Sequence, residues 1–435
     1  MIILPSDASS IPISGKKDFR CALIGEHLGH SDSPMLHAMI ADHSYELCEV
    51  PPDRLGVFLQ SGAFDALNVT IPYKEAVLPY LSRLTDRAAQ IGAVNCIKRT
   101  PEGLIGDNTD ASGFAETLRR ARIAIKGKKV LLLGTGGASR AVRWALERAG
   151  ASVFTVSRKG NLNYGNCTEL CEDADLIVNA TPVGMYPNSG TSPLDLSGFH
   201  SLSAVIDLIY NPLRTALLLD AEQRGIPAYN GAQMLAAQAV AACEFFHGVS
   251  LGEELSSRLS DRICDCLTAE KKNILLIGMP GCGKSTVGAL AAERLNRAFY
   301  DADVILENRV GMSCAEVITR EGEDAFRKRE SEVLRELGAK RGCVIAAGGG
   351  AVTRRENLIP IRENSLVCFL TRETEALATD GRPLSQQRGT EALYRERLPF
   401  YQTFADCTVA NNTPESAADK ICEVFRSLRW SSEER

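Results

Sequence analysis

A glycine-rich turn in the second half of the chain restricts its fold more than any other feature of the sequence. The stretch ILLIGMPGCGKST, residues 274–286, satisfies the pattern GxxxxGK[ST] between an apolar run typical of a strand and a helical pattern. In that setting backbone N–H groups surround phosphates, Lys284 reaches the β- and γ-phosphate oxygens, and Ser285 is placed to hold Mg²⁺. The residues expected to contact ATP here are Gly281, Cys282, Gly283, Lys284, Ser285 and Thr286. The stretch therefore predicts a strand–loop–helix unit that binds a nucleoside triphosphate.

Apolar runs of four to six residues alternate with longer helical patterns along the chain. Examples of the apolar runs are CALIG, KVLLLG, DLIVNAT, SAVIDLI, NILLIG and LVCFL. Such alternation predicts α/β folds with mainly parallel sheets. A length of 435 residues suggests about three domains. The polar stretch 257–272 is the predicted boundary, and we expect a helix with a short tether there because it is not rich in glycine and serine.

Composition excludes several classes of function. A net charge of −5 gives no reason to propose nucleic acid or an anionic membrane as a partner, so we expect small-molecule substrates. The fourteen cysteines form no CxxC pair and show no zinc-like spacing with histidine, which favours a reducing compartment. No apolar stretch approaches the roughly 20 residues of a membrane helix, and the N-terminus does not resemble a signal peptide. We expect a cytoplasmic protein, and its oligomeric state stays open.

A second glycine-rich turn lies upstream, within the strand–turn–helix–strand pattern of residues 128–160. Its glycines allow a sharp turn and a close approach to a pyrophosphate, while the following helix offers its N-terminal N–H groups. The residues of this turn are Gly134, Thr135, Gly136, Gly137 and Ala138. By itself this variant of GxGxxG is also compatible with an ordinary turn between a strand and a helix.

The end of the next strand carries basic residues where dinucleotide folds read the ribose 2′ position. The sequence there is TVSRKG, which contributes Ser157, Arg158 and Lys159 and no carboxylate. An acidic residue at this place favours NAD, whereas a guanidinium accommodates the phosphate of NADP. We therefore expect NADP(H); the alternative is that both basic side chains are simply solvated.

Seven stretches around this turn carry a resemblance to a known family. They are GHSDSPMLH, NVTIPYKEA, IGAVNC, GDNTDASGF, NATPVGM, DLIYNP and NGAQMLAAQA, in this order. Over about residues 21–252 they closely resemble shikimate dehydrogenase. The resemblance implies NADP-linked interconversion of 3-dehydroshikimate and shikimate. It also implies a substrate-binding domain of residues 18–120 and 226–256, with a Rossmann-like NADP domain, residues 121–225, between them.

Reduction of a ketone needs a hydride, which the cofactor supplies, and a proton donor for the developing alkoxide. The resemblance brings Lys74 and Asp110 together at the substrate carbonyl, so we assign Lys74 as the acid/base and Asp110 as its partner. By the same likeness the expected substrate contacts are Ser31, Ser33, Thr70, Asn95, Tyr210 and Gln238. Asp86 and Gly231 match positions near the cofactor. A metal site at His27, His30 and His37 is not expected, because the serines explain that stretch.

The rest of the chain, about residues 273–424, resembles shikimate kinase and implies a P-loop domain of residues 273–428, similar to nucleoside monophosphate kinases. The motifs are FYDADVILE, EGEDAFRKRE, IAAGGGAV, GRPL and RLPFY. They imply that Asp303 binds substrate hydroxyls and helps to remove the proton, and that Asp301 lies near Mg²⁺. Arg327 and Arg397 are expected to clamp the carboxylate. The motif IAAGGGAV contributes Gly348, Gly349 and Gly350, and the resemblance implies that Gly349 permits backbone approach to the substrate.

The resemblance also places Arg382 on a closing segment where it offsets charge on the transferred phosphoryl group. The sequence around GRPL is compressed relative to the family, and Arg388 or Arg395 is an alternative source of that charge. Taken alone, FRKRE is equally consistent with a charged helix face.

The two resemblances together predict consecutive reactions on one ring oxygen. The upstream half would form the 3-hydroxyl of shikimate, and the downstream half would phosphorylate it. Three alternatives stay open: a quinate dehydrogenase that uses NAD, a pseudokinase that binds shikimate or ATP without turnover, and a kinase for another hydroxylated acid such as gluconate.

Overall fold

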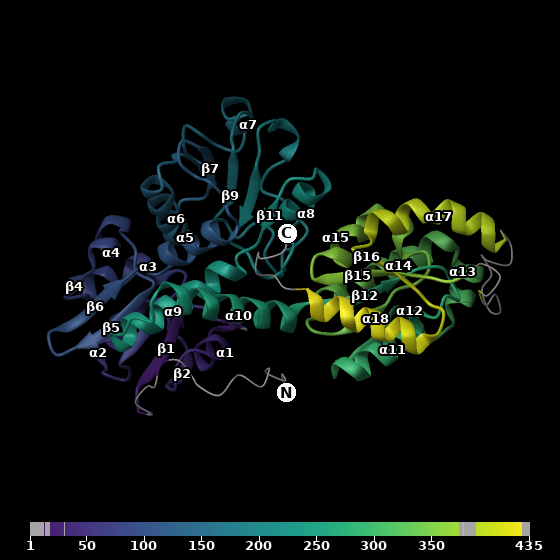
Figure 1. Ribbon diagram of the computed structural model, residues 1–435, viewed down its shortest axis with the longest axis horizontal. Coiled ribbons are helices and arrows are strands. Elements are labelled where there is room, and N and C mark those ends of the chain that lie inside the picture. Colours follow the sequence, from purple (N-terminus) through teal and green to yellow (C-terminus); the bar gives the residue numbers. More distant parts are fainter. Residues whose placement is uncertain (1–12, 14–17, 30, 374–376, 378–388, 429–435) are drawn as a thin grey trace.

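The computed structural model describes residues 13, 18–29, 31–373, 377 and 389–428, and it contains three sheets that follow one another along the chain. The sheets have six, five and five strands, and helices pack against them (Figure 1). This confirms the predicted α/β class. Among the described residues, no helix is both long enough and apolar enough to span a bilayer.

The first sheet is mixed, with strand order β2-β1-β3-β5-β6-β4. β1 runs parallel to β2 and β3, whereas β5 is antiparallel to β3 and β6. The strands are β1 (Arg20–Gly25), β2 (Ser44–Glu49), β3 (Ala66–Val69), β4 (Arg83–Leu84), β5 (Cys96–Thr100) and β6 (Gly103–Asp107). The helices of this unit are α1 (Ser33–Ala38), α2 (Leu55–Gln60), α3 (Tyr73–Ala76) and α4 (Asp86–Ile91).

The second sheet is fully parallel, in the order β11-β10-β9-β7-β8. Its strands are β7 (Lys129–Leu133), β8 (Ser152–Val156), β9 (Leu176–Asn179), β10 (Ala204–Asp207) and β11 (Ala228–Tyr229). The helices around it are α5 (Asp110–Arg120), α6 (Gly137–Arg148), α7 (Cys167–Leu170) and α8 (Ala216–Gln223). Because α7 has only four residues, most of the crossover from β8 to β9 is not helical.

The third sheet is also parallel, in the order β13-β14-β12-β15-β16. Its strands are β12 (Asn273–Ile277), β13 (Phe299–Asp301), β14 (Val344–Ala346), β15 (Ser365–Thr371) and β16 (Cys407–Ala410). All residues of β12 are buried, as expected for a central parallel strand. The helices are α11 (Lys284–Leu295), α12 (Ala302–Val310), α13 (Cys314–Glu321), α14 (Glu323–Gly338), α15 (Leu358–Arg362), α17 (Thr390–Phe404) and α18 (Pro414–Ser427).

Two long helices connect these units. α9 (Ala232–His247) returns from the second sheet to pack on α1, and α10 (Glu253–Lys271) packs on α9. Only Lys272 separates the end of α10 from β12 (Figure 1). Short 3₁₀ turns complete the chain: η1 (Pro52–Arg54), η2 (Leu78–Tyr80), η3 (Leu196–Gly198), η4 (Ala351–Thr353) and η5 (Arg355–Asn357).

The third sheet meets the second unit through segments that precede its strands. Arg214, which is buried, binds Asp406 through Nη1–Oδ1 at 2.8 Å and donates to the Ser365 carbonyl at 2.5 Å. The Tyr186 hydroxyl donates to Glu363 Oε1 at 2.5 Å. Asp406 precedes β16 and Ser365 begins β15, so the amino-terminal edge of the third sheet forms the junction.

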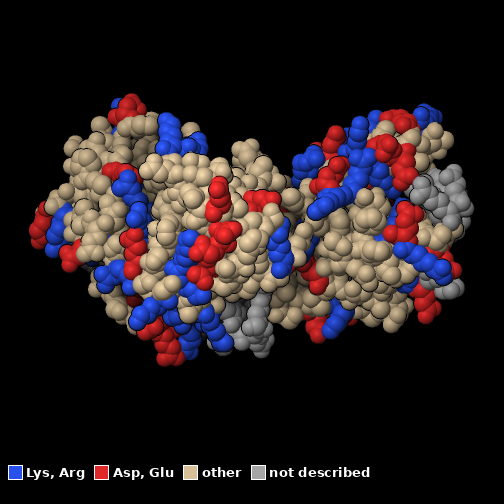
Figure 2. All heavy atoms as spheres, turned by 90° about the horizontal axis from the view of Figure 1, so that it is seen from above, with Lys and Arg blue, Asp and Glu red and all other residues tan. Residues whose placement is uncertain are grey.

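The charged side chains on one face of the molecule agree with the small net charge of the sequence. On the face drawn in Figure 2, basic and acidic side chains are interspersed over both halves. This face carries no broad field of one sign that would favour a polyanion.

Candidate active sites

The first candidate site is built around an ion pair between two neighbouring elements. Nζ of Lys74, on α3, lies 2.6 Å from Oδ2 of Asp110, the first residue of α5. Both side chains are largely buried, at 15% and 8% exposure. The Asn95 amide donates to the other oxygen of Asp110 at 2.9 Å and lies 3.4 Å from Gln238 Oε1. The structure thus brings four sequence-predicted residues into one hydrogen-bonded chain.

The glycine turn after β7 lies against Lys74, the first residue of this hydrogen-bonded group. Gly137 begins α6, and a Cβ added there would lie 3.1 Å from Cβ of Lys74. Gly134 has a positive φ of +105° and lies directly after β7, so a side chain would be disfavoured at this sharp turn. The acid/base candidate and the expected dinucleotide loop therefore share one site.

The predicted carboxylate-binding hydroxyls lie after β1, beside the end of β3. The Ser31 and Ser33 oxygens are 3.1 Å apart, and Ser33 begins α1. Thr70 directly follows β3, where its methyl would be 2.8 Å from a Cβ on Gly25. Tyr210 packs against the cluster formed by α1, α9 and α10. Burial raises the pKa of Tyr210 to about 12, and Asp32 adds to that rise.

The remaining cofactor candidates lie on separate elements. Asp86 begins α4, which contacts α6. Gly231 caps α9, and a Cβ there would lie 1.9 Å from the Leu208 carbonyl oxygen, so only glycine fits. Arg158 and Lys159 are exposed directly after Ser157 at the end of β8, where they are free to meet a ribose phosphate.

The second candidate site is a cavity of about 630 Å³ at the carboxyl-terminal edge of the third sheet. The P-loop, the residues after β13 and the glycine-rich loop after β14 line it. Its lining includes Lys284, Ser285, Asp301, Asp303, Arg327, Gly348, Gly349, Gly350 and Arg397. Ligands of open parallel sheets bind at this edge, so the placement fits a catalytic cavity.

The P-loop is held in shape by its own lysine. Nζ of Lys284 donates to the carbonyls of Gly278 and Met279 at 3.0 and 3.1 Å. Ser285 Oγ donates to Asp301 Oδ2 at 2.5 Å, which places a hydroxyl and a carboxylate where Mg²⁺ accepts oxygen ligands. The loop and its metal-binding candidates are therefore adjacent.

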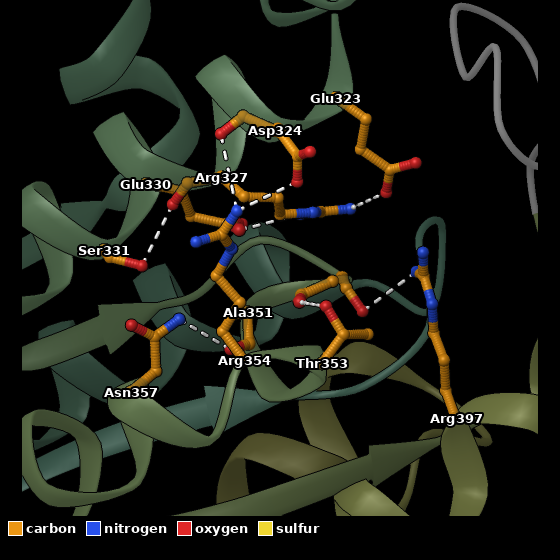
Figure 3. Close-up of polar contacts among 12 residues, drawn as sticks. Glu323, Asp324, Arg327, Glu330, Ser331, Ala351, Thr353, Arg354, Asn357 and Arg397 are labelled. Atoms are coloured by element: carbon orange, nitrogen blue, oxygen red, sulfur yellow. Dashed lines mark hydrogen bonds and ion pairs between the residues drawn. The ribbon is translucent and has the colours of Figure 1, made fainter.

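Two arginines approach the glycine-rich loop from different helices (Figure 3). Arg327 on α14 pairs with Glu330 at 2.7 Å and with Glu323 at 3.2 Å. Arg397 on α17 donates to the Gly349 carbonyl at 3.1 Å. A Cβ on Gly349 would lie 2.6 Å from the ring of Pro280 in the P-loop, so the two loops are in direct contact.

Asp303 has the environment of a proton acceptor. Burial and the nearby carboxylate of Glu330 raise the pKa of Asp303 to about 6, although Lys284 and Arg327 oppose the rise. A base is most effective when its pKa lies near the working pH. The side chain also lines the cavity beside the P-loop.

Comparisons with known proteins identify the families that the two halves resemble. The family model described as shikimate kinase matches residues 280–426, and that described as shikimate dehydrogenase substrate binding domain matches residues 23–97. A shikimate dehydrogenase (NADP(+)) of Carboxydothermus hydrogenoformans is 38% identical over 255 residues, which are 52% of this chain and 91% of that protein. One from Thermus thermophilus is 37% identical over 246 residues, 53% and 93% of the two chains. The chain belongs to the shikimate dehydrogenase family and also carries a shikimate kinase domain.

Solved structures show the same dehydrogenase architecture. The chorismate mutase/shikimate 5-dehydrogenase fusion protein of Clostridium acetobutylicum has a TM-score of 0.54 and 36% identity, with 57% of this chain and 97% of that chain covered. Shikimate 5-dehydrogenase of Thermus thermophilus in complex with NADP(H) and shikimate has a TM-score of 0.50 and 34% identity, covering 56% and 99%. Both matches cover nearly all of the known chain and just over half of this one.

The dehydrogenase half has the features that its cofactor requires. A Cβ on Gly136 would meet nothing within 4 Å, so the loop is open where a pyrophosphate would approach. The twelve-residue helix α6 starts at this loop and points its N-terminal N–H groups toward it. These features fit NADP(H), and the kinase cavity with its P-loop fits ATP and Mg²⁺.

Sequence reasoning missed three residues at these sites. Glu330 is buried and forms an ion pair with Arg327. Its position three residues after Arg327 in FRKRE is the spacing at which two helical side chains meet, so the sequence could have predicted this pair. Arg372, directly after β15, lines the kinase cavity and adds a cation. Thr109 receives a hydrogen bond from Asn95 at 3.0 Å, as the middle of GDNTD suggests.

Most of the expected closing segment around GRPL lies outside the residues that the structure describes. Arg382 and Arg388 lie outside the described residues. Arg395 pairs with Glu391 at 2.5 Å, and its side chain is 77% exposed. Since Arg395 is not part of the cavity lining, Arg372 is the better-placed alternative source of charge.

Proposed function

We propose that the chain catalyses two consecutive steps of the shikimate pathway. The dehydrogenase half interconverts 3-dehydroshikimate and shikimate with NADP(H). The kinase half transfers the γ-phosphoryl group of ATP to the 3-hydroxyl of shikimate. The observation that carries this proposal is the joint presence of the Lys74–Asp110 pair against Gly137 and the cavity that unites the P-loop with Arg327.

In the dehydrogenase half, bound NADPH would supply the hydride for C3 of the ketone. Lys74 donates a proton to the oxygen as negative charge develops there, and the reverse reaction returns that proton. Asp110 holds the ammonium at 2.6 Å, and Asn95 fixes the second oxygen of Asp110. Ser31 and Ser33 bind the carboxylate at the other end of the ring. This arrangement orients the substrate and leaves Lys74 free to act on one atom.

In the kinase half, Arg327 and Arg397 bind the substrate carboxylate and Asp303 receives the hydroxyl proton. Lys284 stabilises the negative charge of the phosphates, and ATP supplies the phosphoryl group. Ser285 and Asp301 would hold the metal ion, which offsets negative charge on the phosphates. Glu330 keeps the Arg327 guanidinium in place at 2.7 Å, so the clamp is preorganised.

The proposed domain limits are those expected from the sequence. Residues 18–120 and 226–256 form the substrate-binding domain, and residues 121–225 form the NADP-binding domain. Residues 257–272 link them to the kinase domain of residues 273–428. The linker falls largely within α10, a continuous helix, which supports a fixed connection.

One assay tests both activities. The full chain is given 3-dehydroshikimate, NADPH, Mg²⁺ and ATP, and the products are identified by mass. Shikimate 3-phosphate is expected; omission of ATP should stop the sequence at shikimate, and omission of NADPH should leave the ketone. Formation of neither shikimate nor its phosphate would overturn the proposal.

Parallel reactions distinguish the rival activities. Quinate with NAD tests the alternative dehydrogenase, and gluconate with ATP tests the alternative kinase. Shikimate with ATP tests the pseudokinase, which predicts no ADP above background. Faster turnover of either rival substrate would replace the corresponding half of the proposal.

A further inference from the structure

The carboxylate of Asp32 lies between two cations that come from outside the dehydrogenase sheets. Oδ2 of Asp32 is 2.7 Å from Nζ of Lys271, the last residue of α10. Oδ1 is 3.7 Å from Nη1 of Arg341, which precedes β14 in the kinase domain. The Lys271 side chain is 2% exposed and that of Asp32 is 15% exposed. Each oxygen of Asp32 therefore faces a different cation, and the kinase domain supplies one of them.

Gly342, the residue after Arg341, fixes the backbone of this segment against the end of α10. The Gly342 N–H donates to the Lys271 carbonyl at 3.2 Å. Gly342 has a φ of +63°, and a Cβ there would lie 2.6 Å from the Glu270 carbonyl oxygen. A side chain is therefore excluded at this position. This turn explains why Arg341 is directed at the dehydrogenase half.

The same cluster adjoins the residues proposed to bind the substrate carboxylate. Asp32 stands between Ser31 and Ser33 in the chain, and these two hydroxyls are 3.1 Å apart. Asp32 is the N-cap residue of α1, yet its side chain makes no capping hydrogen bond and pairs with Lys271 instead. Nζ of Lys271 lies 5.4 Å from the ring centroid of Tyr210.

Charge decides what this cluster does for an anionic substrate. An unpaired Asp32 beside the two serines would repel a carboxylate, because like charges at this range oppose each other by Coulomb's law. Lys271 alone neutralises Asp32. Arg341 adds a second cation, so these three side chains carry one net positive charge. The removal of Arg341 leaves them neutral and removes the net attraction.

We infer that Arg341 of the kinase domain and Lys271 of the connecting helix set the charge and position of the carboxylate-binding loop in the dehydrogenase site. The inference rests on the proposed function, in which Ser31 and Ser33 bind the shikimate carboxylate. Arg341 is a positioning residue here, since it acts through Asp32. The kinase domain thus contributes to substrate recognition by the other active site.

The test compares a charged substrate with its uncharged analogue. The full chain and its Arg341→Gln variant are assayed for oxidation of shikimate and of methyl shikimate with NADP⁺. The variant should raise KM for shikimate about three- to tenfold at low ionic strength, the range expected for one partly screened charge. KM for the methyl ester, KM for NADP⁺ and the kinase turnover should stay unchanged. Added salt should raise KM for shikimate in the wild type and do so less in the variant.

Two further variants complete the experiment. Arg341→Lys keeps the charge and should retain most of the wild-type KM. Arg309→Gln is the matched control, because it removes an exposed kinase arginine that pairs with Glu336 at a distance of 2.7 Å and takes no part in this cluster. It should leave KM for shikimate unchanged.

The outcomes separate the inference from the proposed function. An active wild type whose KM for shikimate is unaffected by Arg341→Gln would overturn the inference alone. Equal rises for shikimate and the ester, or joint loss of both activities, would show that Arg341 only maintains the fold. A wild type that oxidises neither compound would overturn the proposed function, and the inference with it.

Discussion

At the scale of single residues, each of the two active sites depends on one lysine, and both lysines stabilise negative charge. Lys74 is held by Asp110 at 2.6 Å, and Lys284 is held by backbone carbonyls of the P-loop. In both cases a lysine ammonium is placed where negative charge develops during the reaction. Lys74 lies on α3 beside the first sheet and Lys284 begins α11 beside the third, so each site should fail independently.

The lysines can be tested by reciprocal substitution. Lys74→Ala should lower the rate of ketone reduction by about 10²- to 10⁴-fold, because it removes the proton donor, while ATP use continues. Lys284→Ala should do the reverse. NADPH consumption and ADP release, measured on the same samples, check both expectations. Joint loss in either variant would contradict independent sites.

The raised pKa of Asp303 predicts how the kinase rate falls at low pH. Since its pKa is raised to about 6, the carboxylate is the base form above that value and becomes protonated below it. The kcat/KM for shikimate should therefore fall about tenfold per pH unit below pH ~6. A profile of kcat/KM measured by ADP release checks this, with the dehydrogenase rate as a control. A profile flat to pH 5 would remove Asp303 as the base.

At the scale of elements, the two glycine-rich loops differ in the space that surrounds their glycines. The loop after β14 is packed against the P-loop, since Gly349 lies against Pro280. The loop after β7 is open at Gly136, whose φ of −75° suits any residue. One glycine is therefore needed for packing, whereas the other leaves room for a ligand.

Two alanine variants should separate these roles. Gly349→Ala forces Cβ into the P-loop, so it should destabilise the kinase domain by about 1–3 kcal/mol and lower its turnover. Gly136→Ala should leave the melting temperature unchanged but raise KM for NADPH, because the methyl group meets the approaching phosphate. Thermal scans combined with steady-state kinetics distinguish the two effects. An unstable Gly136→Ala protein would show that this loop also packs tightly.

At the scale of the whole molecule, the two halves join at the edge of the kinase sheet opposite the kinase site. The junction residues Ser365 and Asp406 lie at the start of β15 and directly before β16, whereas the catalytic loops follow β12, β13 and β14. The five residues of β12 alone span about 17 Å. The kinase cavity therefore opens away from the dehydrogenase.

This arrangement predicts that shikimate passes between the sites through solvent. Labelled 3-dehydroshikimate supplied with NADPH and ATP should yield labelled shikimate 3-phosphate, and excess unlabelled shikimate should dilute that label fully. Product analysis by mass measures the dilution. Retention of label would indicate a direct route that this geometry does not supply.

The junction itself depends on a buried ion pair. Although burial opposes it, Arg214 and Arg362 hold the pKa of Asp406 well below its ordinary value. Stability from this pair is therefore fully present above the unfolded pKa of about 4 and is lost as the pH falls toward the folded pKa. Arg214→Met should destabilise the junction by about 3 kcal/mol. Calorimetry should then show a larger difference between the melting temperatures of the two halves.

The control for the junction is Arg258→Met, which removes an exposed i,i+4 pair with Glu254 on α10. Such pairs contribute little, so the calorimetric trace should match the wild type. A similar separation of transitions in both variants would contradict a specific role for Arg214.

The sequence by itself determined the local units of this protein. The glycine turns and the strand–helix alternation predicted the two nucleotide loops, because these signals lie within one strand–loop–helix unit. The roles of Lys74 and of the kinase carboxylates were expected from the family resemblance of motifs such as TIPYKE. Glu330 was also within reach, since it lies one helical turn from Arg327. Only the tertiary structure decided which edge of the kinase sheet faces the dehydrogenase. Arg214 and Asp406 are 192 positions apart, and Asp32 meets Arg341 across both domains. Such contacts depend on how whole sheets pack, and no local pattern of residues records that packing.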